Sequence, residues 1–268
     1  MSDGALQADT TKARVQAQYG PAAEAYAVSQ VHARGASLGR LLVLAEIGPD
    51  HSALDVATAA GHTALAVAPL ARRVVGVDLT PAMLAVAARL ARERGLTNVE
   101  FIEGDAERLP AADGTFDRVL CRIALHHFPD PAQAVREMAR VLKPGGRVAL
   151  VDNIVPPDPA VAAFINRFET LRDPSHHWLF PLSELVAMFR DAGLDVVHTE
   201  TLDKVMDFHD WTARMGVPSS LEAELWTMLV AASGAIGTFL APAEHDGGRV
   251  FTLHEGIVIA TKPRQACP

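Results

Sequence analysis

The sequence has few cysteines and no long apolar run. Its 268 residues include only two cysteines, Cys121 and Cys267, and their separation is not that of a metal-binding pair. So few cysteines fit a reducing compartment. No apolar stretch approaches the ~20 residues of a membrane span, and the N-terminal segment MSDGALQADTTKAR is polar where a signal peptide needs an apolar core. We therefore expect a cytoplasmic protein without a membrane span.

Basic clusters are also missing. The formal net charge is −8, and no block of lysine and arginine interrupts this acidic balance, so we expect no nucleic-acid partner. Hydrophobic residues make up 49% of the chain, which is ample for a packed core in one large α/β domain or two small ones. Because no internal repeat or low-complexity tract divides the chain, we treat residues 1–268 as a single domain.

The sequence does contain a regular alternation of short apolar runs and helical segments up to residue 153. This alternation predicts βαβ units in a parallel sheet. One helix begins at Pro81 with Thr80 at its cap position, a favoured arrangement because proline lacks only an N–H that would be unpaired there. The predicted strands are 53–57, 72–79, 98–106, 116–124 and 147–153, and the helices are 36–47, 62–71, 81–94 and 132–142.

The pattern changes at both ends of the chain. Residues 1–35 predict a broken helix, interrupted by Gly20 and Pro21, which is either a loosely docked arm or a cover. After residue 153, two further strands would most simply pair antiparallel, with helical insertions around them. The strands are 194–202 and 250–261, and the helices are 160–172, 183–192 and 221–230. We divide the domain into an N-terminal helical cover (1–47), a core (48–153), and insertions with strands six and seven (154–268).

The stretch LDVATAAGHT, followed by VVGVDLT, predicts a ligand site. A strand, a small-residue turn and a helix start are followed by a second strand that ends in Asp78. In a parallel sheet this turn lies at the carboxyl edge, where a nucleotide can sit against backbone N–H groups and a helix N-terminus. The Asp78 carboxylate could accept hydrogen bonds from both ribose hydroxyls. Asp55, near the end of the first strand, should bond N–H groups of its own loop, because an unpaired buried carboxylate is costly.

Five segments between residues 54 and 153 carry a family resemblance. They are LDVATAAGHT, VVGVDLTPAML, EGDAERLP, FDRVLCRIALHHFPDP and VLKPGGRVALVD, with looser matches in YGPAAEAY and DPSHHWLF. In this order they resemble the class I S-adenosylmethionine-dependent methyltransferases, and within them the group similar to the ubiquinone and menaquinone biosynthesis methyltransferases. The resemblance implies a Rossmann-like α/β sandwich with a seven-stranded, mostly parallel sheet whose last strand is antiparallel.

The resemblance also implies which residues bind S-adenosyl-L-methionine. The backbone of Ala57, Thr58, Ala59 and Gly61 would hold its methionine part, Asp78 its ribose, and Leu79 and Met83 would flank its adenine. Asp105 and Ala106 would meet the adenine edge, Cys121 and Arg122 would border the sulfonium, and Tyr26 and His32 would lie on the cofactor side of the N-terminal cover.

The sequence departs from the family in this first loop. The usual pattern is acidic-x-Gly-x-Gly-x-Gly, whereas this chain has Asp55-x-Ala57-x-Ala59-x-Gly61. Glycine serves in such loops where φ is positive or where a ligand approaches the backbone closely, and a Cβ obstructs both. Alanine is tolerated there wherever φ is negative.

Four histidines are candidate catalytic bases. His126 and His127 follow the fourth strand, and because adjacent residues on an extended backbone point apart, at most one of them should face the pocket. His176 and His177 lie in the irregular segment DPSHHWLF. Histidine can take a proton near neutral pH, as methylation of a hydroxyl or phenol would need, but these rings could equally hydrogen-bond or stack within their loops. No Ser-His-Asp order or His-x-x-x-His pair suggests hydrolase or metal chemistry, so we expect no metal.

These observations give one leading hypothesis and two alternatives. The leading one is transfer of a methyl group from S-adenosylmethionine to a small, largely apolar acceptor, by O- or C-methylation. The aromatic residues after residue 173 could line the acceptor pocket, or form core or the surface of a homodimer; they are Trp178, Phe180, Phe208, Trp211 and Trp226. The alternatives are a protein that binds S-adenosylmethionine or S-adenosylhomocysteine without methyl transfer, and a nicotinamide-dependent oxidoreductase, whose G-x-G-x-x-G is absent.

Overall fold

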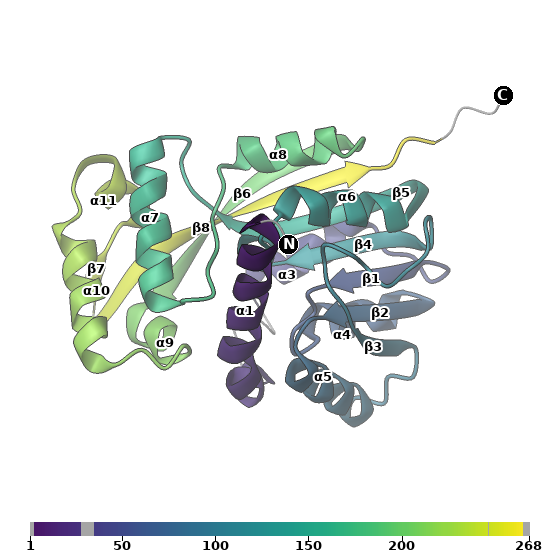
Figure 1. The fold of residues 1–268 in the computed structure, drawn as a ribbon, viewed down its shortest axis with the longest axis horizontal. Coiled ribbons are helices and arrows are strands. Elements are labelled where there is room, and N and C mark those ends of the chain that lie inside the picture. Colours follow the sequence, from purple (N-terminus) through teal and green to yellow (C-terminus); the bar gives the residue numbers. More distant parts are fainter. Residues whose placement is uncertain (1–2, 28–34, 246, 265–268) are drawn as a thin grey trace.

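One twisted sheet crosses the whole molecule, with helices on both faces (Figure 1). The computed structural model describes residues 3–27, 35–245 and 247–264. The strand order is β3-β2-β1-β4-β5-β8-β6, with β7 paired to β8. The strands are β1 (Ser52–Val56), β2 (Arg73–Asp78), β3 (Val99–Glu103), β4 (Phe116–Arg122), β5 (Leu142–Ile154), β6 (Asp195–Asp207), β7 (Ala243–His245) and β8 (Gly248–Thr261).

The sheet has the predicted architecture. Strands β1 to β5 are parallel to one another, and the last strand, β8, is antiparallel to both β5 and β6. The Rossmann-like fold and the antiparallel last strand are therefore confirmed. An eighth strand, β7, was not predicted because it is only three residues long and forms a hairpin with the start of β8.

The helices differ from the predictions mostly at their ends. They are α1 (Asp3–Ala27), α3 (Ala36–Ala45), α4 (His62–Val67), α5 (Pro81–Glu93), α6 (Pro131–Val141), α7 (Pro159–Arg172), α8 (Leu182–Asp191), α9 (Phe208–Ala213), α10 (Ser219–Ala231) and α11 (Gly234–Leu240). Two short 3₁₀ turns, at Ala68–Leu70 and Leu125–His127, follow α4 and β4. The short helices α9 and α11 were not predicted.

The predicted break in the N-terminal helix is wrong. Helix α1 runs through Gly20 and Pro21 without interruption. Proline removes one hydrogen bond from a helix interior, but the turn beyond it is held by packing. Ala23 and Tyr26 lie in a buried hydrophobic cluster with Ala60 of the first loop and Met83 and Val86 of α5.

Two long strands, β6 and β8, carry a second hydrophobic core beyond the parallel part of the sheet. They pair from Asp195 opposite Thr261 to Asp207 opposite Val250. Helices α7, α9, α10 and α11 gather around their far ends, and α1 stands between this group and the β1–β3 side of the sheet (Figure 1). Phe208, Trp211 and Trp226 lie in this second core, whereas Trp178 is exposed.

Within the described ranges, no single helix has both the length and the apolar character to cross a membrane. Helices α10 and α11 reach that length only as a pair, and the pair is bent by 117°.

Candidate functional site

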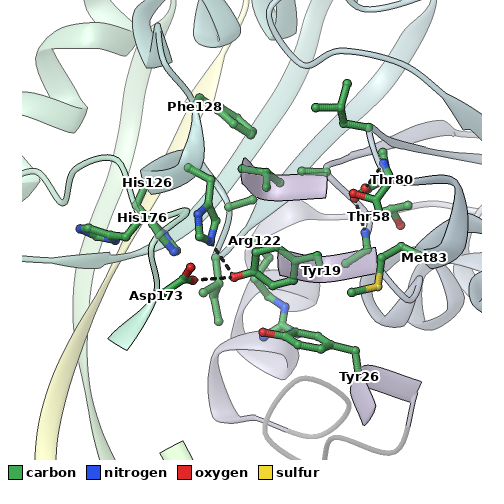
Figure 2. Close-up of a pocket in the computed structure, with 18 of the residues that line it drawn as sticks. Tyr19, Tyr26, Thr58, Thr80, Met83, Arg122, His126, Phe128, Asp173 and His176 are labelled. Carbon is green, nitrogen blue, oxygen red and sulfur yellow. Dashed lines mark hydrogen bonds between the residues drawn. The ribbon is translucent and has the colours of Figure 1, made fainter. Parts of the chain in front are cut away.

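A cavity lies at the carboxyl edge of the parallel strands, with α1 along one side. It collects residues from the loop after β1, the end of β2, the turns after β3 and β4, and helices α7 and α9. In Figure 2, Thr58, Thr80 and Met83 lie on one side, Asp173, His126 and His176 on the other, and Tyr19 between them. The sequence-predicted site residues that line the cavity are Tyr26, Ala57, Thr58, Ala59, Asp78, Leu79, Met83, Asp105, Ala106, Arg122, His126, His127 and His176.

Three predicted site residues within the described ranges do not line the cavity. Gly61 is the N-cap of α4 with φ of 82°, and a Cβ there would come within 2.8 Å of the Ala87 Cβ, so this glycine serves helix packing. Cys121 is fully buried in the core, because alternation along β4 turns its neighbour Arg122 toward the cavity instead. His177 is exposed outside the cavity, and His32 falls outside the described residues.

The loop after β1 has a left-handed backbone at both alanines. The φ angle is 54° at Ala57 and 47° at Ala59, so neither has the negative φ at which alanine is tolerated without strain. The loop is held by Asp55, whose Oδ2 accepts hydrogen bonds from Thr58 Oγ1 (2.6 Å) and the Ala64 N–H (3.0 Å). Burial raises the pKa of Asp55 to about 7. Asp55 was predicted to bond backbone N–H groups of its own loop; instead, its partners are a loop hydroxyl, that of Thr58, and one backbone N–H from α4, that of Ala64.

Asp78 stands at the end of β2 with its carboxylate ordered by the backbone. Oδ2 accepts the Ala59 N–H (2.8 Å) and Oδ1 accepts the Thr80 N–H (2.9 Å). As predicted, α5 begins at Pro81 with Thr80 at its cap position, although the Thr80 side chain makes no capping hydrogen bond. Burial raises the pKa of Asp78. Each carboxylate oxygen can accept a further hydrogen bond, and the side chain lines the cavity.

One face of α1 covers this end of the cavity. Lys12, Val15, Tyr19 and Tyr26 recur along it and all line the cavity. Lys12 Nζ bonds the carboxylates of Asp105 (2.8 Å) and Glu107. Burial lowers the pKa of Lys12, but these two carboxylates outweigh burial and raise it. Lys12 was missed in the sequence because its partners lie more than ninety positions away.

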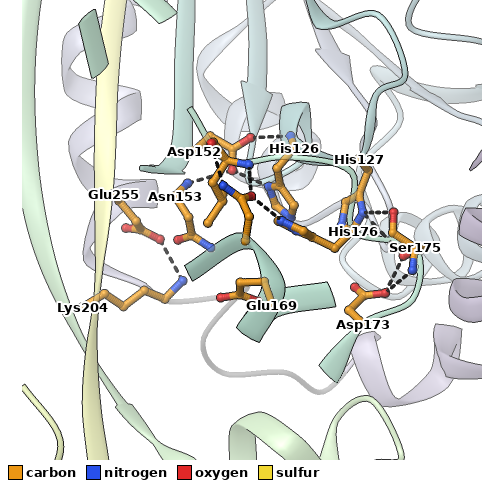
Figure 3. Close-up of polar contacts among 12 residues, drawn as sticks. His126, His127, Asp152, Asn153, Glu169, Asp173, Ser175, His176, Lys204 and Glu255 are labelled. Atoms are coloured by element: carbon orange, nitrogen blue, oxygen red, sulfur yellow. Dashed lines mark hydrogen bonds and ion pairs between the residues drawn. The ribbon is translucent and has the colours of Figure 1, made fainter. Parts of the chain in front are cut away.

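His126 pairs with a buried carboxylate, Asp152, at the end of β5 (Figure 3). The His126 backbone N–H donates to Asp152 Oδ2 (3.0 Å), and His126 Nδ1 lies 2.6 Å from Asp152 Oδ1. Because a carboxylate only accepts, Nδ1 carries the proton and Nε2 is left as the acceptor nitrogen. Burial lowers the pKa of His126, but the charge and hydrogen bond of Asp152, with Glu169 and Asp173, raise it overall.

The other two candidate histidines that line the cavity, His127 and His176, are engaged on other side chains. His127 Nε2 lies 2.9 Å from the Tyr19 hydroxyl, which also donates to Asp173 (3.1 Å). His176 Nε2 donates to Asn166 Oδ1 (2.9 Å), an atom that also accepts from the backbone. Burial and the neighbouring His126 lower the pKa of His127 to about 4 and that of His176 to about 2.

The prediction that only one residue of the 126–127 pair faces the pocket is wrong. Both rings line the cavity, and their centroids are 4.2 Å apart. The reason is that this segment is a 3₁₀ turn, Leu125–His127, in which successive side chains do not point to opposite sides as they do in a strand. Asp152 was also missed, although its place at the end of a predicted strand was a usable signal.

Known proteins match this chain in sequence and in fold. Residues 54–150 match a family described as a methyltransferase domain. Over 238 residues, 88% of this chain and 94% of the relative, the chain is 40% identical to the uncharacterized methyltransferase YcgJ of Bacillus subtilis strain 168. The chain belongs to the class I S-adenosylmethionine-dependent methyltransferases.

The crystal structure of YcgJ matches this methyltransferase with a TM-score of 0.81 at 38% identity, over 85% of this chain and 98% of that one. A demethylmenaquinone methyltransferase of Listeria welshimeri serovar 6b is 37% identical over 142 residues, 46% of this chain and 60% of its own length. The predicted resemblance is confirmed, and the methyltransferase is not the nicotinamide-dependent oxidoreductase weighed as an alternative.

Proposed function

We propose that this enzyme binds S-adenosylmethionine at the Asp78 end of the cavity and methylates a hydroxyl group of a small acceptor. His126 removes the hydroxyl proton. The observation that carries the proposal is the His126–Asp152 pair, which leaves an acceptor nitrogen on a ring that lines the same cavity as Asp78. A general base of this kind is required for a hydroxyl and not for every carbon acceptor, so the pair favours O-methylation over C-methylation.

The residues at the Asp78 end fit the cofactor. Asp78 has acceptor capacity left beyond its two backbone bonds, which suits ribose hydroxyls. Leu79, Met83 and Ala106 give the cavity an apolar lining beside it, which suits a purine ring. The backbone of Ala57, Thr58 and Ala59 and the side chain of Arg122 would hold the methionine part.

The cofactor, when bound, supplies a methyl group on a positively charged sulfur that leaves as a neutral thioether. The protein must then align the acceptor, exclude water and receive one proton. Helix α1 covers the cavity, and His126 Nε2 makes no hydrogen bond to a described residue, so it is available for the acceptor hydroxyl. Asp152 orients the ring and stabilises the imidazolium that forms.

His126 suits this role better than the other lining histidines, among which His62 has its Nε2 2.8 Å from the Tyr26 carbonyl oxygen and a pKa lowered by burial. The Nε2 atoms of His127 and His176 already meet Tyr19 and Asn166. Their lowered pKa values, about 4 and about 2, make them weak bases, whereas the pKa of His126 is raised. A base gains driving force for proton transfer as its pKa rises toward the working pH.

The test is methyl transfer from methyl-labelled S-adenosylmethionine to a panel of phenols and quinols. Labelled product is expected with the wild-type enzyme, and His126→Gln should lower kcat/KM by about 10²- to 10⁴-fold. His177→Gln, an exposed histidine outside the cavity, is the matched control and should act like wild type. Tight binding of S-adenosylhomocysteine with no turnover anywhere in the panel would instead favour a binding protein, and full activity of His126→Gln would exclude His126 as the base.

A further inference from the structure

The end of the cavity away from Asp78 contains buried polar atoms without partners. Among the described residues, Asn153 Oδ1, Glu169 Oε1 and Arg214 Nε are buried and make no hydrogen bond. All three residues line the cavity. A buried polar atom without a partner is costly, and in native proteins it usually marks a place where water or a ligand completes the bonding.

Three cations at this end, Arg172, Lys204 and Arg214, face three carboxylates, Glu169, Asp173 and Glu255, but not every cation is paired directly. Lys204 Nζ is paired with Glu255 (2.8 Å), as Figure 3 shows. Arg172 Nη1 is 3.9 Å from Glu169 Oε2, the outer limit of an ion pair. The Arg214 guanidinium forms no ion pair with any side chain in the described ranges, although its Nε is fully buried. Among the three cations at this end, Arg214 is therefore the one that forms no ion pair with a described carboxylate.

Arg172 and Arg214 both line this side of the cavity, and Trp211 of α9 positions the first of them. Arg172 Nε donates to the Trp211 carbonyl (3.1 Å), and its guanidinium lies over the Trp211 ring, 4.6 Å from the ring centroid. Arg214 follows Trp211 by three residues, at the C-terminal end of α9. Burial and the nearby Arg172 charge both lower the pKa of Arg214. Two cations held together in a largely buried place are stabilised when an anion lies between them.

An anion bound by Arg172 and Arg214 would be separate from the carboxylate of the cofactor, which we propose lies at the Asp78 end. Arg122, at the end of β4, lies beside the first loop, where its Nε donates to Thr63 Oγ1 (3.2 Å). It is therefore placed for the methionine carboxylate of the cofactor. Arg172 and Arg214 belong to α7 and α9, on the side of the cavity formed by the second core, together with the apolar side chains of Met206 and Leu253.

We propose that the acceptor is a hydroxy acid, a molecule with an apolar body, a hydroxyl that reaches His126, and a carboxylate bound by Arg172 and Arg214. This inference rests on the proposed function and narrows its acceptor from small and largely apolar to small and anionic. Planar guanidinium groups match a carboxylate with paired N–H donors. Glu169 Oε1 and Asn153 Oδ1 would accept hydrogen bonds from further hydroxyl or amino groups on the same molecule.

The experiment measures acceptor binding by calorimetry to enzyme saturated with S-adenosylhomocysteine. The probes are 4-hydroxybenzoate, 3,4-dihydroxybenzoate and 4-hydroxycinnamate, each paired with its neutral methyl ester. With the wild-type enzyme, at least one acid should bind about tenfold or more tightly than its ester, since a charge-assisted pair is worth that much. Arg214→Gln should remove this preference, and Arg214→Lys should keep part of it.

Arg167→Gln is the matched control, because Arg167 is an exposed arginine of α7 that does not line the cavity. It should keep the wild-type preference, and Arg214→Gln should keep the wild-type affinity for S-adenosylhomocysteine. The proposal is overturned if no acid binds more tightly than its ester, or if Arg214→Gln weakens S-adenosylhomocysteine instead, which would assign Arg214 to the cofactor. Failure of wild-type enzyme to bind S-adenosylhomocysteine at all would contradict the proposed function, and with it this inference.

Discussion

The two ends of the cavity differ in how their polar side chains are held. At the Asp78 end, which we propose binds the cofactor and call the cofactor end, Asp55 and Asp78 accept hydrogen bonds from backbone N–H groups of the loop after β1, α4 and the start of α5. At the opposite end, which we propose binds the acceptor and call the acceptor end, Asn153, Glu169 and Arg214 each have a buried polar atom that makes no hydrogen bond to a described residue. The carboxylates of the cofactor end are therefore positioned by the backbone before any ligand binds, which suits a single cofactor. The polar atoms of the acceptor end remain available for hydrogen bonds to the acceptor.

The same difference decides what the sequence could predict. A strand end followed by a small-residue turn places Ala57, Thr58 and Asp78 at the carboxyl edge of the sheet by local rules, so their position in the cavity was predictable, and their role as cofactor ligands stays a prediction. At the acceptor end, Arg172, Trp211 and the far part of β8 meet across tens of residues, and α9 is only six residues long. No local pattern marks such a contact, which is why Glu169, Arg172 and Arg214 were missed.

Particular errors have the same origin. The turn at Leu125–His127 overrode the alternation expected of an extended loop, and packing on α5 carried α1 through Pro21. Both outcomes depend on tertiary contacts that a single sequence does not display.

The largest expected effect tests whether the acceptor end has its own core. Phe168 is fully buried there and stacks on Trp211, with centroids 5.0 Å apart. Phe168→Ala should lower the free energy of unfolding by about 3–5 kcal/mol, measured by urea denaturation, and Phe168→Leu should cost less. If the two ends are distinct, the folded fraction of Phe168→Ala should still bind S-adenosylhomocysteine with nearly wild-type affinity. A large loss of that affinity would show that the ends depend on each other.

A change at Asp152 tests the base that lies between the two ends. In the wild type, kcat/KM should rise with pH as His126 loses its proton, with an inflection above the ordinary histidine pKa because Asp152 raises the pKa of His126. Asp152→Asn removes that charge, so the inflection should move to lower pH and the plateau should fall by about tenfold or more. The pH–rate profiles measure both effects. If the inflection stays at the same pH in Asp152→Asn, Asp152 does not set the pKa of the group that titrates in the pH–rate profile.

Tyr19 joins the cover to the acceptor end. Its hydroxyl bonds Asp173 and lies against His127, so Tyr19→Phe should lower the free energy of unfolding by about 1 kcal/mol. Protection of α1 amides from hydrogen exchange should fall in parallel. Arg14, an exposed residue of the same helix, serves as the control. Arg14→Gln should change neither the free energy of unfolding nor the protection of α1 amides. Unchanged protection in Tyr19→Phe would mean that Lys12, together with Gln16, whose Nε2 donates to the Leu79 carbonyl (2.7 Å), suffices to hold α1.

The smallest expected effect is a gain in stability at the cofactor end. Ala59 adopts φ of 47°, a region that glycine occupies without strain. Ala59→Gly should raise the free energy of unfolding by up to about 1 kcal/mol, by relief of that strain less the entropy that glycine adds to the unfolded chain. Ala66→Gly, in the middle of α4 with an ordinary helical backbone, should instead destabilise the enzyme. Loss of stability in both variants would show that the loop is not strained.

The most direct test of a cofactor held at the end of β2 is calorimetric titration of S-adenosylhomocysteine into wild type, Asp78→Ala and Asp50→Ala. Asp50 is an exposed carboxylate outside the cavity and serves as the control. We expect wild type and Asp50→Ala to bind alike, and Asp78→Ala to bind about 100-fold more weakly, because two charge-assisted hydrogen bonds to ribose are lost. The claim that Asp78 binds the cofactor would be contradicted if Asp78→Ala and wild type bound S-adenosylhomocysteine with equal affinity, or if neither bound it.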